Sequence, residues 1–200
     1  MKSTLMINER IKFMSSPIVL IISGPSGAGK GTVVEALLKK MDFALSISAT
    51  SREPRKNDID GVNYFFYNKE DFEKMIAADE FLEYAEFCGN YYGTPRSYVD
   101  KSIKEGKDVL LEIEIQGSLQ VKKKIPEAIL VFLTPPSLEV LEQRLRGRNT
   151  ETEEKIQLRL AKAEEELKML DLYDYVVVND TVEKSVEDII EIVNAEKNKK

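Results

Sequence analysis

The 200-residue sequence contains no histidine and a single cysteine. Without histidine, the chain cannot build a Ser-His-Asp triad, a Cys-His dyad or an imidazole-based metal site. Cys88 alone cannot form an internal disulfide, which favours a reducing compartment. Positive charge is not in excess either, because 35 acidic and 29 basic side chains give a formal charge of −6. We therefore expect no nucleic-acid partner, and any anionic ligand must be met by local basic clusters.

Long apolar runs are also missing. The apolar stretch at residues 18–22 is far shorter than the roughly 20 residues that a membrane-spanning helix needs. Residues 1–16 mix charged and apolar side chains and lack the apolar centre of a secretory signal. We expect a cytoplasmic protein without a membrane partner, preceded by a flexible N-terminal extension over residues 1–16.

Patterns of buried strands alternate with helical patterns along the chain. Residues 18–23 predict a fully buried strand, and residues 30–40 predict a helix whose apolar side chains recur at helical spacing. Further buried strands are expected at residues 44–47, 108–113, 128–133 and 175–178. Such alternation is typical of an α/β fold with a parallel sheet.

Two segments interrupt this alternation. Residues 48–98 contain charged turns and an aromatic run, which predicts an inserted lobe. Residues 137–168 are strongly charged and helical in pattern, with a break near residues 150–154 that predicts two helices joined by a turn. The expected core is the remainder, residues 17–47, 99–136 and 169–195, and residues 196–200 are expected to form a solvated polar tail.

A glycine-rich segment lies between the first predicted strand and the first predicted helix. Its sequence, Gly-Pro-Ser-Gly-Ala-Gly-Lys-Gly-Thr, has the spacing of a phosphate-binding loop. Glycines let successive backbone N–H groups converge on phosphate oxygens, and the start of the helix adds a partial positive charge. The predicted nucleotide-binding residues of this loop are Gly24, Pro25, Ser26, Gly27, Ala28, Gly29, Lys30, Gly31 and Thr32.

The loop departs from the stricter pattern at one position. Gly31 follows Lys30 where a Ser or Thr hydroxyl usually binds Mg²⁺, and Thr32 comes one position later. Mg²⁺ accepts a shell made mostly of water and substrate phosphates. We expect the metal to be held chiefly by nucleotide and water, with Thr32 assisting and Glu112 acting through water.

A second polar cluster, Ser-Ile-Ser-Ala-Thr-Ser-Arg-Glu-Pro-Arg, occupies residues 46–55. Arg52 and Arg55 can both point at one anion, and guanidinium groups bind phosphate oxygens in a bidentate manner. The hydroxyl groups of Tyr64 and Tyr92 can add neutral donors. The cluster therefore predicts a second anion site.

Three further segments complete a family pattern: Glu-Tyr-Ala-Glu-Phe at 83–87, Asn-Tyr-Tyr-Gly-Thr at 90–94 and Glu-Ile-Glu-Ile-Gln-Gly at 112–117. Over residues 17–195 the chain resembles the guanylate kinase family. The resemblance implies a P-loop, three-layer α/β fold with a parallel central sheet. It also implies an inserted mixed α/β GMP-binding lobe at residues 48–98, and a helical lid at 137–168.

The resemblance implies transfer of the γ-phosphoryl group of ATP to GMP and dGMP, with Mg²⁺ as cofactor. No general base is needed, because the GMP phosphate is already a competent nucleophile. The work of the site is then to align two anions and to offset their repulsion with cations. This chemistry agrees with a chain that has no histidine.

Recognition of the base is expected to depend on carboxylates. Guanine presents N1–H and N2–H₂ donors on one edge, and Glu83 is the candidate that accepts from both, whereas the N1 lone pair of adenine would repel it. By resemblance, Ser48 and Thr94 would contact guanine O6, and Glu114 would support the exocyclic amine. The complete predicted GMP-binding set is Ser48, Arg52, Arg55, Tyr64, Glu83, Tyr92, Thr94 and Glu114.

The charged helical segment carries the arginines that a lid would bring to the phosphates, and Arg144 and Arg148 are spaced to share one helical face. The catalytic residues implied by the resemblance are Lys30, Arg52, Arg144, Arg148 and Arg159. Asn179, after the last predicted strand, would contact the adenosine half of ATP. The chain departs from the family pattern at Ser51, Asn57, Asp58, Glu112, Glu114 and Asn149.

Two alternatives stay open at this point. A monophosphate kinase for another base, such as AMP, shares the Gly-Lys-Gly-Thr ending of the loop, and a guanylate-kinase-like module without activity would bind proteins instead. The acidic base-reading residues argue against the first, and Lys30 with the lid arginines argues against the second. A P-loop GTPase is a poorer alternative. The sequence leaves the oligomeric state open, with a homo-oligomer as one alternative.

Overall fold

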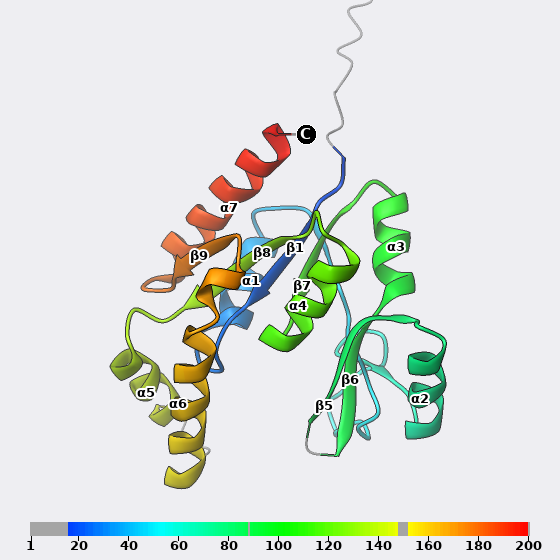
Figure 1. Cartoon of the computed structure of the whole chain (residues 1–200), viewed down its shortest axis with the longest axis horizontal. Helices are drawn as coiled ribbons and strands as arrows, with labels where there is room; N and C mark the ends of the chain where they lie inside the picture. Colours follow the sequence, from blue (N-terminus) through cyan, green and yellow to red (C-terminus); the bar gives the residue numbers. More distant parts are fainter. Residues whose placement is uncertain (1–15, 88, 148–151, 200) are drawn as a thin grey trace, which may run out of the picture.

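Five parallel strands form the central sheet of the computed structural model, which describes residues 16–87, 89–147 and 152–199 (Figure 1). Their order is β2-β7-β1-β8-β9, so the first strand lies in the middle between β7 and β8. This order places the carboxyl end of β1 at a topological switch point, where ligands of open α/β sheets bind. The strands are β1 (Val19–Ser23), β2 (Phe43–Leu45), β7 (Asp108–Glu112), β8 (Ile129–Thr134) and β9 (Tyr175–Val178).

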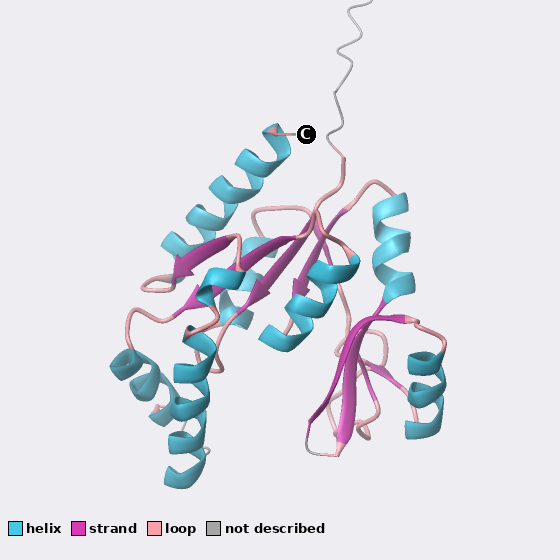
Figure 2. Ribbon diagram, viewed as in Figure 1, coloured by secondary structure: helices cyan, strands magenta, loops and turns pink. Residues whose placement is uncertain are grey.

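Helices cover both faces of this sheet and make three layers (Figure 2). Alternate residues of β1 point to opposite faces: Leu20 packs with α1 (Lys30–Leu38) and α7 (Val182–Asn198), whereas Ile21 packs with α3 (Arg96–Lys104) and α4 (Ile115–Lys124). Both β1 side chains are completely buried. A strand buried on both faces explains the continuous apolar run in its sequence.

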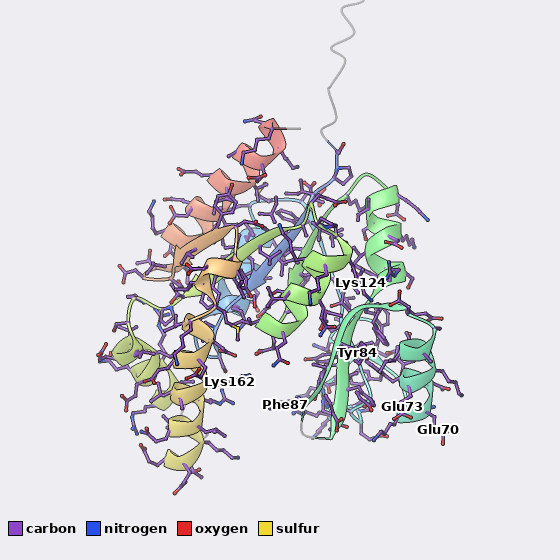
Figure 3. The ribbon with its side chains drawn as sticks, viewed as in Figure 1. Glu70, Glu73, Tyr84, Phe87, Lys124 and Lys162 are labelled. Carbon is purple, nitrogen blue, oxygen red and sulfur yellow. The ribbon has the colours of Figure 1, made fainter. Side chains whose placement is uncertain are left out.

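A second, mixed sheet has the order β4-β3-β6-β5. Phe72 from the neighbouring helix stacks on the rings of Phe81 and Tyr91, at centroid distances of 4.4 and 5.4 Å. Gln120 of α4 joins this sheet to the central one, because its amide makes two hydrogen bonds with the backbone of the exposed Tyr84 (Figure 3). The elements are β3 (Ala49–Thr50), β4 (Phe65–Phe66), α2 (Lys69–Ala77), β5 (Phe81–Phe87) and β6 (Asn90–Pro95).

Helices α5 (Leu138–Arg146) and α6 (Glu153–Leu167) pack together around their own small apolar cluster, and the short helix η1 (Leu170–Leu172) follows. Arg146 of α5 forms an ion pair with Glu153 at the start of α6, with an Nη2–Oε1 distance of 2.6 Å. In Figure 1, α5 and α6 lie on one side of the carboxyl end of the central sheet, and the second sheet lies on the other.

The predicted parallel α/β sheet is confirmed, and β9 has the expected bounds. Helix α1 ends at Leu38 rather than at residue 40, and β2 begins at Phe43, one residue before the expected position. Helix α7 continues to Asn198, so residues 196–198, expected in a solvated tail, are helical. Lys197 in this last turn forms an ion pair with Asp108 at the start of β7. Among the described residues, no helix has both the length and the apolar character needed to cross a bilayer.

Candidate active site

The loop between β1 and α1 requires glycine at two positions. Gly24 has φ +146°, and a Cβ built on it would lie 2.1 Å from the carbonyl oxygen of Leu133. Gly29 precedes the first turn of α1 with φ +92°, and its Cβ would meet the amide nitrogen of Asn179 at 2.5 Å. A side chain at either position would displace the loop, because the left-handed conformation and the close contacts both exclude it. The glycines therefore hold the backbone of the loop close to β8 and to residue 179.

Lys30 is the first residue of α1, and its side chain folds back over the loop. Its Nζ donates to the carbonyl oxygens of Gly24 and Pro25, at 2.6 and 3.2 Å. The ammonium group thus lies on the loop that leads into the amino end of α1, where unpaired N–H groups favour an anion. This arrangement can bind a polyphosphate.

Asn179, at the end of β9, ties the loop down from the other side. The residue is only 3% exposed; its side chain donates from Nδ2 to the carbonyl oxygen of Ala28 at 2.7 Å and accepts from Ser185 Oγ at 3.1 Å. Asn179 was expected to contact adenosine, but both polar atoms of its side chain form hydrogen bonds within the protein. Sequence reasoning could not find this role, because residues 28, 179 and 185 are too far apart in the chain to form a local pattern.

Two of the predicted lid arginines reach the same loop. Arg144 of α5 donates to the carbonyl oxygens of Asn179 (2.8 Å) and Ala28 (3.4 Å). Arg159 of α6 donates from Nη1 to the hydroxyl of Ser26 at 3.0 Å. The structure thus brings residues from both helices to the predicted phosphate site. Arg148 lies outside the described residues.

Oxygen groups that suit a hard cation lie beside the loop. Thr32 is exposed on the first turn of α1, and the Glu112 carboxylate at the end of β7 lies 3.7 Å from where a Cβ of Gly31 would be. The protein around Glu112 displaces water and raises the pKa of its carboxyl group, whereas the charge of Lys30 acts in the opposite direction. A hydroxyl and a carboxylate are oxygen ligands of the kind that Mg²⁺ prefers.

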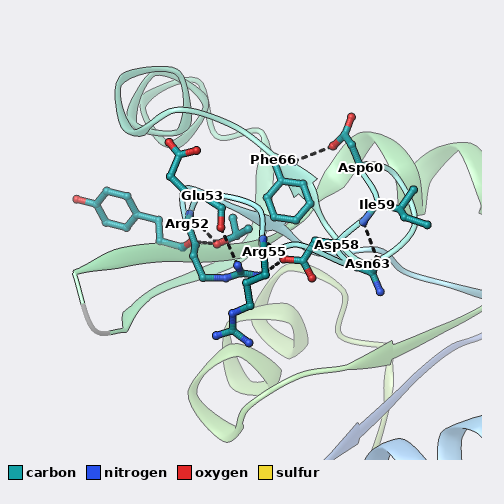
Figure 4. Close-up of polar contacts among 10 residues, drawn as sticks. Arg52, Glu53, Arg55, Asp58, Ile59, Asp60, Asn63 and Phe66 are labelled. Atoms are coloured by element: carbon teal, nitrogen blue, oxygen red, sulfur yellow. Dashed lines mark hydrogen bonds and ion pairs between the residues drawn. The ribbon is translucent and has the colours of Figure 1, made fainter.

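Arg52 is held in place by the turn that follows β3 (Figure 4). Its guanidinium donates to Asp58 Oδ2 at 2.8 Å and to the carbonyl oxygen of Glu53 at 2.7 Å. The same Asp58 oxygen accepts the backbone N–H of Arg55 at 2.8 Å. These two hydrogen bonds, with that from Arg55 the larger effect, hold the pKa of Asp58 below its usual value. Asp58, which sequence reasoning noted only as a departure, therefore holds the guanidinium of Arg52 and the backbone of Arg55.

Aromatic rings surround the Arg52 guanidinium. Its central carbon lies 5.7 Å from the ring centres of Tyr64 and Phe66, a distance that permits cation–π attraction. The ring of Tyr92 meets that of Tyr64 edge-on, with centroids 6.0 Å apart. Arg52, Tyr64 and Tyr92 thus share one corner of the second sheet, and the side chain of Arg55 is exposed beside them. Ser48, half-buried before β3, accepts the backbone N–H of Phe65 through its carbonyl oxygen.

Glu83 of β5 lies buried between Thr94 of β6 and the start of α4, with 7% of its surface exposed. The hydroxyl of Thr94 donates to Glu83 Oε1 at 2.7 Å, and the other oxygen lies 2.6 Å from where a Cβ of Gly117 would be. Burial raises the pKa of Glu83 to about 7, and the hydrogen bonds from Thr94 oppose this rise. A Cβ at position 117 would displace this carboxylate, so the first turn of α4 lies directly against Glu83.

Glu114 precedes α4 and is exposed; its side chain makes no capping hydrogen bond. Its carboxylate lies 3.5 Å from Nζ of Lys162 on α6. The predicted residues therefore gather in two groups, one around the loop and one around Glu83 and Arg52. Glu112 ends β7 beside the loop, Glu114 precedes α4, and the first turn of α4 lies against Glu83, so this segment connects the two groups.

Three comparisons with known proteins all point to the same family. The guanylate kinase family model matches residues 16–196. The chain is 55% identical to the guanylate kinase of Bacillus anthracis over 90% of this chain and 88% of the relative, and 50% identical to that of Clostridioides difficile over 94% and 92%. A crystal structure of guanylate kinase from Anaplasma phagocytophilum superposes with a TM-score of 0.73 at 32% identity, covering 92% of this chain and 87% of that one.

Proposed function

The chain belongs to the guanylate kinase family, and we propose that it transfers the γ-phosphoryl group of ATP to GMP and dGMP at the carboxyl end of the central sheet. The observation that carries this proposal is the pairing of an intact phosphate loop, closed by Lys30, with a buried base-reading carboxylate, Glu83. The first provides the site for a triphosphate, and the second provides the preference for guanine.

ATP binds through residues 24–32. The backbone N–H groups at the start of α1 and the ammonium group of Lys30 meet the phosphates, and Lys30 exchanges its carbonyl partners for phosphate oxygens. Asn179 acts on ATP through the loop that it tethers rather than by contact with the adenosine half. Arg144 and Arg159, already at the loop, stabilise the charge on the transferring group, together with Arg148.

GMP binds on the second sheet, in a lobe that comprises residues 48–98. Arg52, Arg55, Tyr64 and Tyr92 receive its phosphate, and Asp58 keeps the guanidinium of Arg52 oriented before the nucleotide arrives. Glu83 accepts from guanine N1–H and N2–H₂; Ser48 and Thr94 lie near O6, and Glu114 near the amine. An oriented site of this kind lowers the entropic cost of aligning the two substrates.

The remaining parts of the domain at residues 17–195 have separate tasks. Residues 17–47, 99–136 and 169–195 form the core, and residues 137–168 form a lid that excludes water during transfer. Mg²⁺ fits beside Thr32 and Glu112, where it would neutralise phosphate charge when bound together with ATP. The GMP phosphate oxygen attacks the γ-phosphorus directly, so no protein base takes part. The cytoplasm, where both nucleotides occur, is the proposed location.

A substrate panel tests this function. Purified protein with ATP and Mg²⁺ should release ADP rapidly with GMP, and far more slowly with AMP, CMP or UMP. Lys30→Ala should lower kcat by roughly 10²- to 10³-fold, in the range found when one charge-stabilising donor is removed. Lys39→Ala, at an exposed position just after the same helix, is the matched control and should retain full activity.

Two results would contradict the proposal. Preference for AMP would make the enzyme a kinase for another base. Equal inactivity of the unaltered protein and of Lys30→Ala would instead favour a protein-binding module.

A further inference from the structure

An ion cluster at the base-reading end of the site involves a residue with no role so far. Lys162 Nζ lies 3.5 Å from Glu114 Oε2 and 3.4 Å from Glu166 Oε1. The three side chains differ in exposure: 59% for Lys162, 60% for Glu114 and 10% for Glu166. Burial raises the pKa of Glu166, and the charge of Lys162 is the main influence against it. The ammonium group of Lys162 therefore bridges the buried carboxylate of Glu166 and the exposed carboxylate of Glu114.

The placement of Lys162 on α6 connects the two halves of the site. Arg159, Lys162 and Glu166 are three and four residues apart, so they share one face of the helix. Arg159 contacts Ser26 in the phosphate loop, and Lys162 contacts Glu114 at the start of α4. Figure 3 shows Lys162 extending from α6 on the side that faces α4. One helical face thus spans from the ATP loop to the guanine site.

Without Lys162 the neighbouring charges would push Glu114 away from its position. Glu114 and Glu166 carry like charges within 3.5 Å of the same ammonium group, and the charge of Glu114 adds to the pKa rise of Glu166. Glu114 has no side-chain hydrogen bond to its own helix that would fix its direction. A cation between the two carboxylates both offsets their repulsion and restricts the more exposed one.

We propose that Lys162 is a positioning residue for GMP: it holds the Glu114 carboxylate where the exocyclic amine of guanine binds, and so couples the position of α6 to base recognition. This role rests on the proposed function, because it requires Glu114 to receive guanine. Because the pair is largely exposed, the effect on GMP affinity is modest, about two- to fivefold.

The test is a double-mutant cycle in steady-state kinetics, with Lys162→Met, Glu114→Gln and both together. Lys162→Met should raise KM for GMP about two- to fivefold and leave KM for ATP and kcat unchanged. Lys162→Arg, which keeps the charge, should restore KM for GMP. In the Glu114→Gln background, Lys162→Met should have no further effect. Lys155→Met, which removes an exposed lysine of the same helix, is the control and should match the unaltered protein.

Other outcomes would overturn this role. If Lys162→Met left KM for GMP unchanged, or raised it equally in the Glu114→Gln background, Lys162 would not act through Glu114. An effect that disappeared with Glu166→Gln but persisted with Glu114→Gln would make the lysine a stabiliser of α6 alone. Failure of the unaltered protein to phosphorylate GMP would refute the proposed function itself. If the unaltered protein phosphorylated GMP normally but the effects of Lys162→Met and Glu114→Gln on KM for GMP were additive, only the role of Lys162 would be refuted.

Discussion

In its proposed role as the base-reading residue, Glu83 would combine a cost in stability to the free protein with selectivity for guanine. Its pKa rises from 4.5 to about 7 on burial, so an ionised Glu83 costs on the order of 3 kcal/mol above that pH. Since the folded pKa lies above the unfolded one, this cost appears as the pH rises from about 4.5 through 7. In the proposed complex, guanine would offset this cost by donating two hydrogen bonds, which adenine cannot supply.

The affinity for GMP should therefore depend on pH through Glu83. The carboxylate must be ionised to accept from guanine N1–H, and it is mostly protonated at pH 6 but mostly ionised at pH 8. We expect Kd for GMP, measured by calorimetry, to be roughly tenfold lower at pH 8 than at pH 6. Glu83→Gln should bind GMP more weakly. Its Kd should no longer change with ionisation of residue 83, but it should still change with ionisation of the GMP phosphate. The same pH dependence in both proteins would contradict the role of Glu83.

At the scale of residues, the sequence identifies candidate groups whose proposed roles depend on local spacing or on the chemistry of the base. Lys30 lies on the loop as expected, and Glu83 is buried beside Thr94. Sequence reasoning assigned Asn179 to adenosine and no role to Lys162, because the partners of both residues are distant in the chain. Contacts that depend on how elements pack leave no local pattern in the sequence.

At the scale of elements, the phosphate loop is held by its own glycines and also by hydrogen bonds through Asn179, which follows β9 and is bonded to Ser185 of α7. Asn179→Ala would remove the hydrogen bond to Ala28 and the bond from Ser185 at a buried position. We expect a loss of about 1–3 kcal/mol in the free energy of unfolding, measured with urea. KM for ATP should rise severalfold, because the loop is no longer held, and KM for GMP should stay close to its normal value.

Asn194→Ala is the matched control for this prediction, since Asn194 is exposed on α7. It should change neither stability nor KM. If Asn179→Ala kept normal stability and lost only ATP affinity, direct contact of Asn179 with the nucleotide would be the better account.

Whether a segment is a helix or a strand could be predicted from the periodicity of its apolar residues. Where a helix or strand ends depends on tertiary contacts, which the sequence does not show. The apolar runs of β1 and β8 identify strands that are buried on both faces. The end of α7 could not be predicted in this way, because residues 196–200 are polar and lack a helical apolar pattern. The ion pair between Lys197 and Asp108 instead accompanies the extension of the helix to Asn198.

At the scale of the whole molecule, an acidic protein must bind two anions. The formal charge of −6 opposes nucleotide binding at long range, so the cations of the site have to act locally. The fold achieves this by bringing Lys30, Arg144 and Arg159 together from α1, α5 and α6. Arg52, the proposed cation for the GMP phosphate, follows β3 of the second sheet, and Figure 1 shows this sheet on the other side of the carboxyl end of the central sheet from α5 and α6.

Because the site draws on segments throughout the chain, ligand binding should stabilise the fold as a whole. A ligand at 100 times its Kd adds about 2.7 kcal/mol to the free energy of unfolding. For a chain of this length that corresponds to a rise in Tm of roughly 5–10 °C. We expect GMP at this concentration to produce such a rise in thermal unfolding, and AMP at the same concentration to produce at most about 1 °C. Glu83→Gln should reduce the difference between the two nucleotides, because it replaces the acceptor that adenine repels with an amide that either base can meet. Equal shifts with GMP and AMP in the unaltered protein would mean that the phosphate site alone supports binding, and that Glu83 does not read the base.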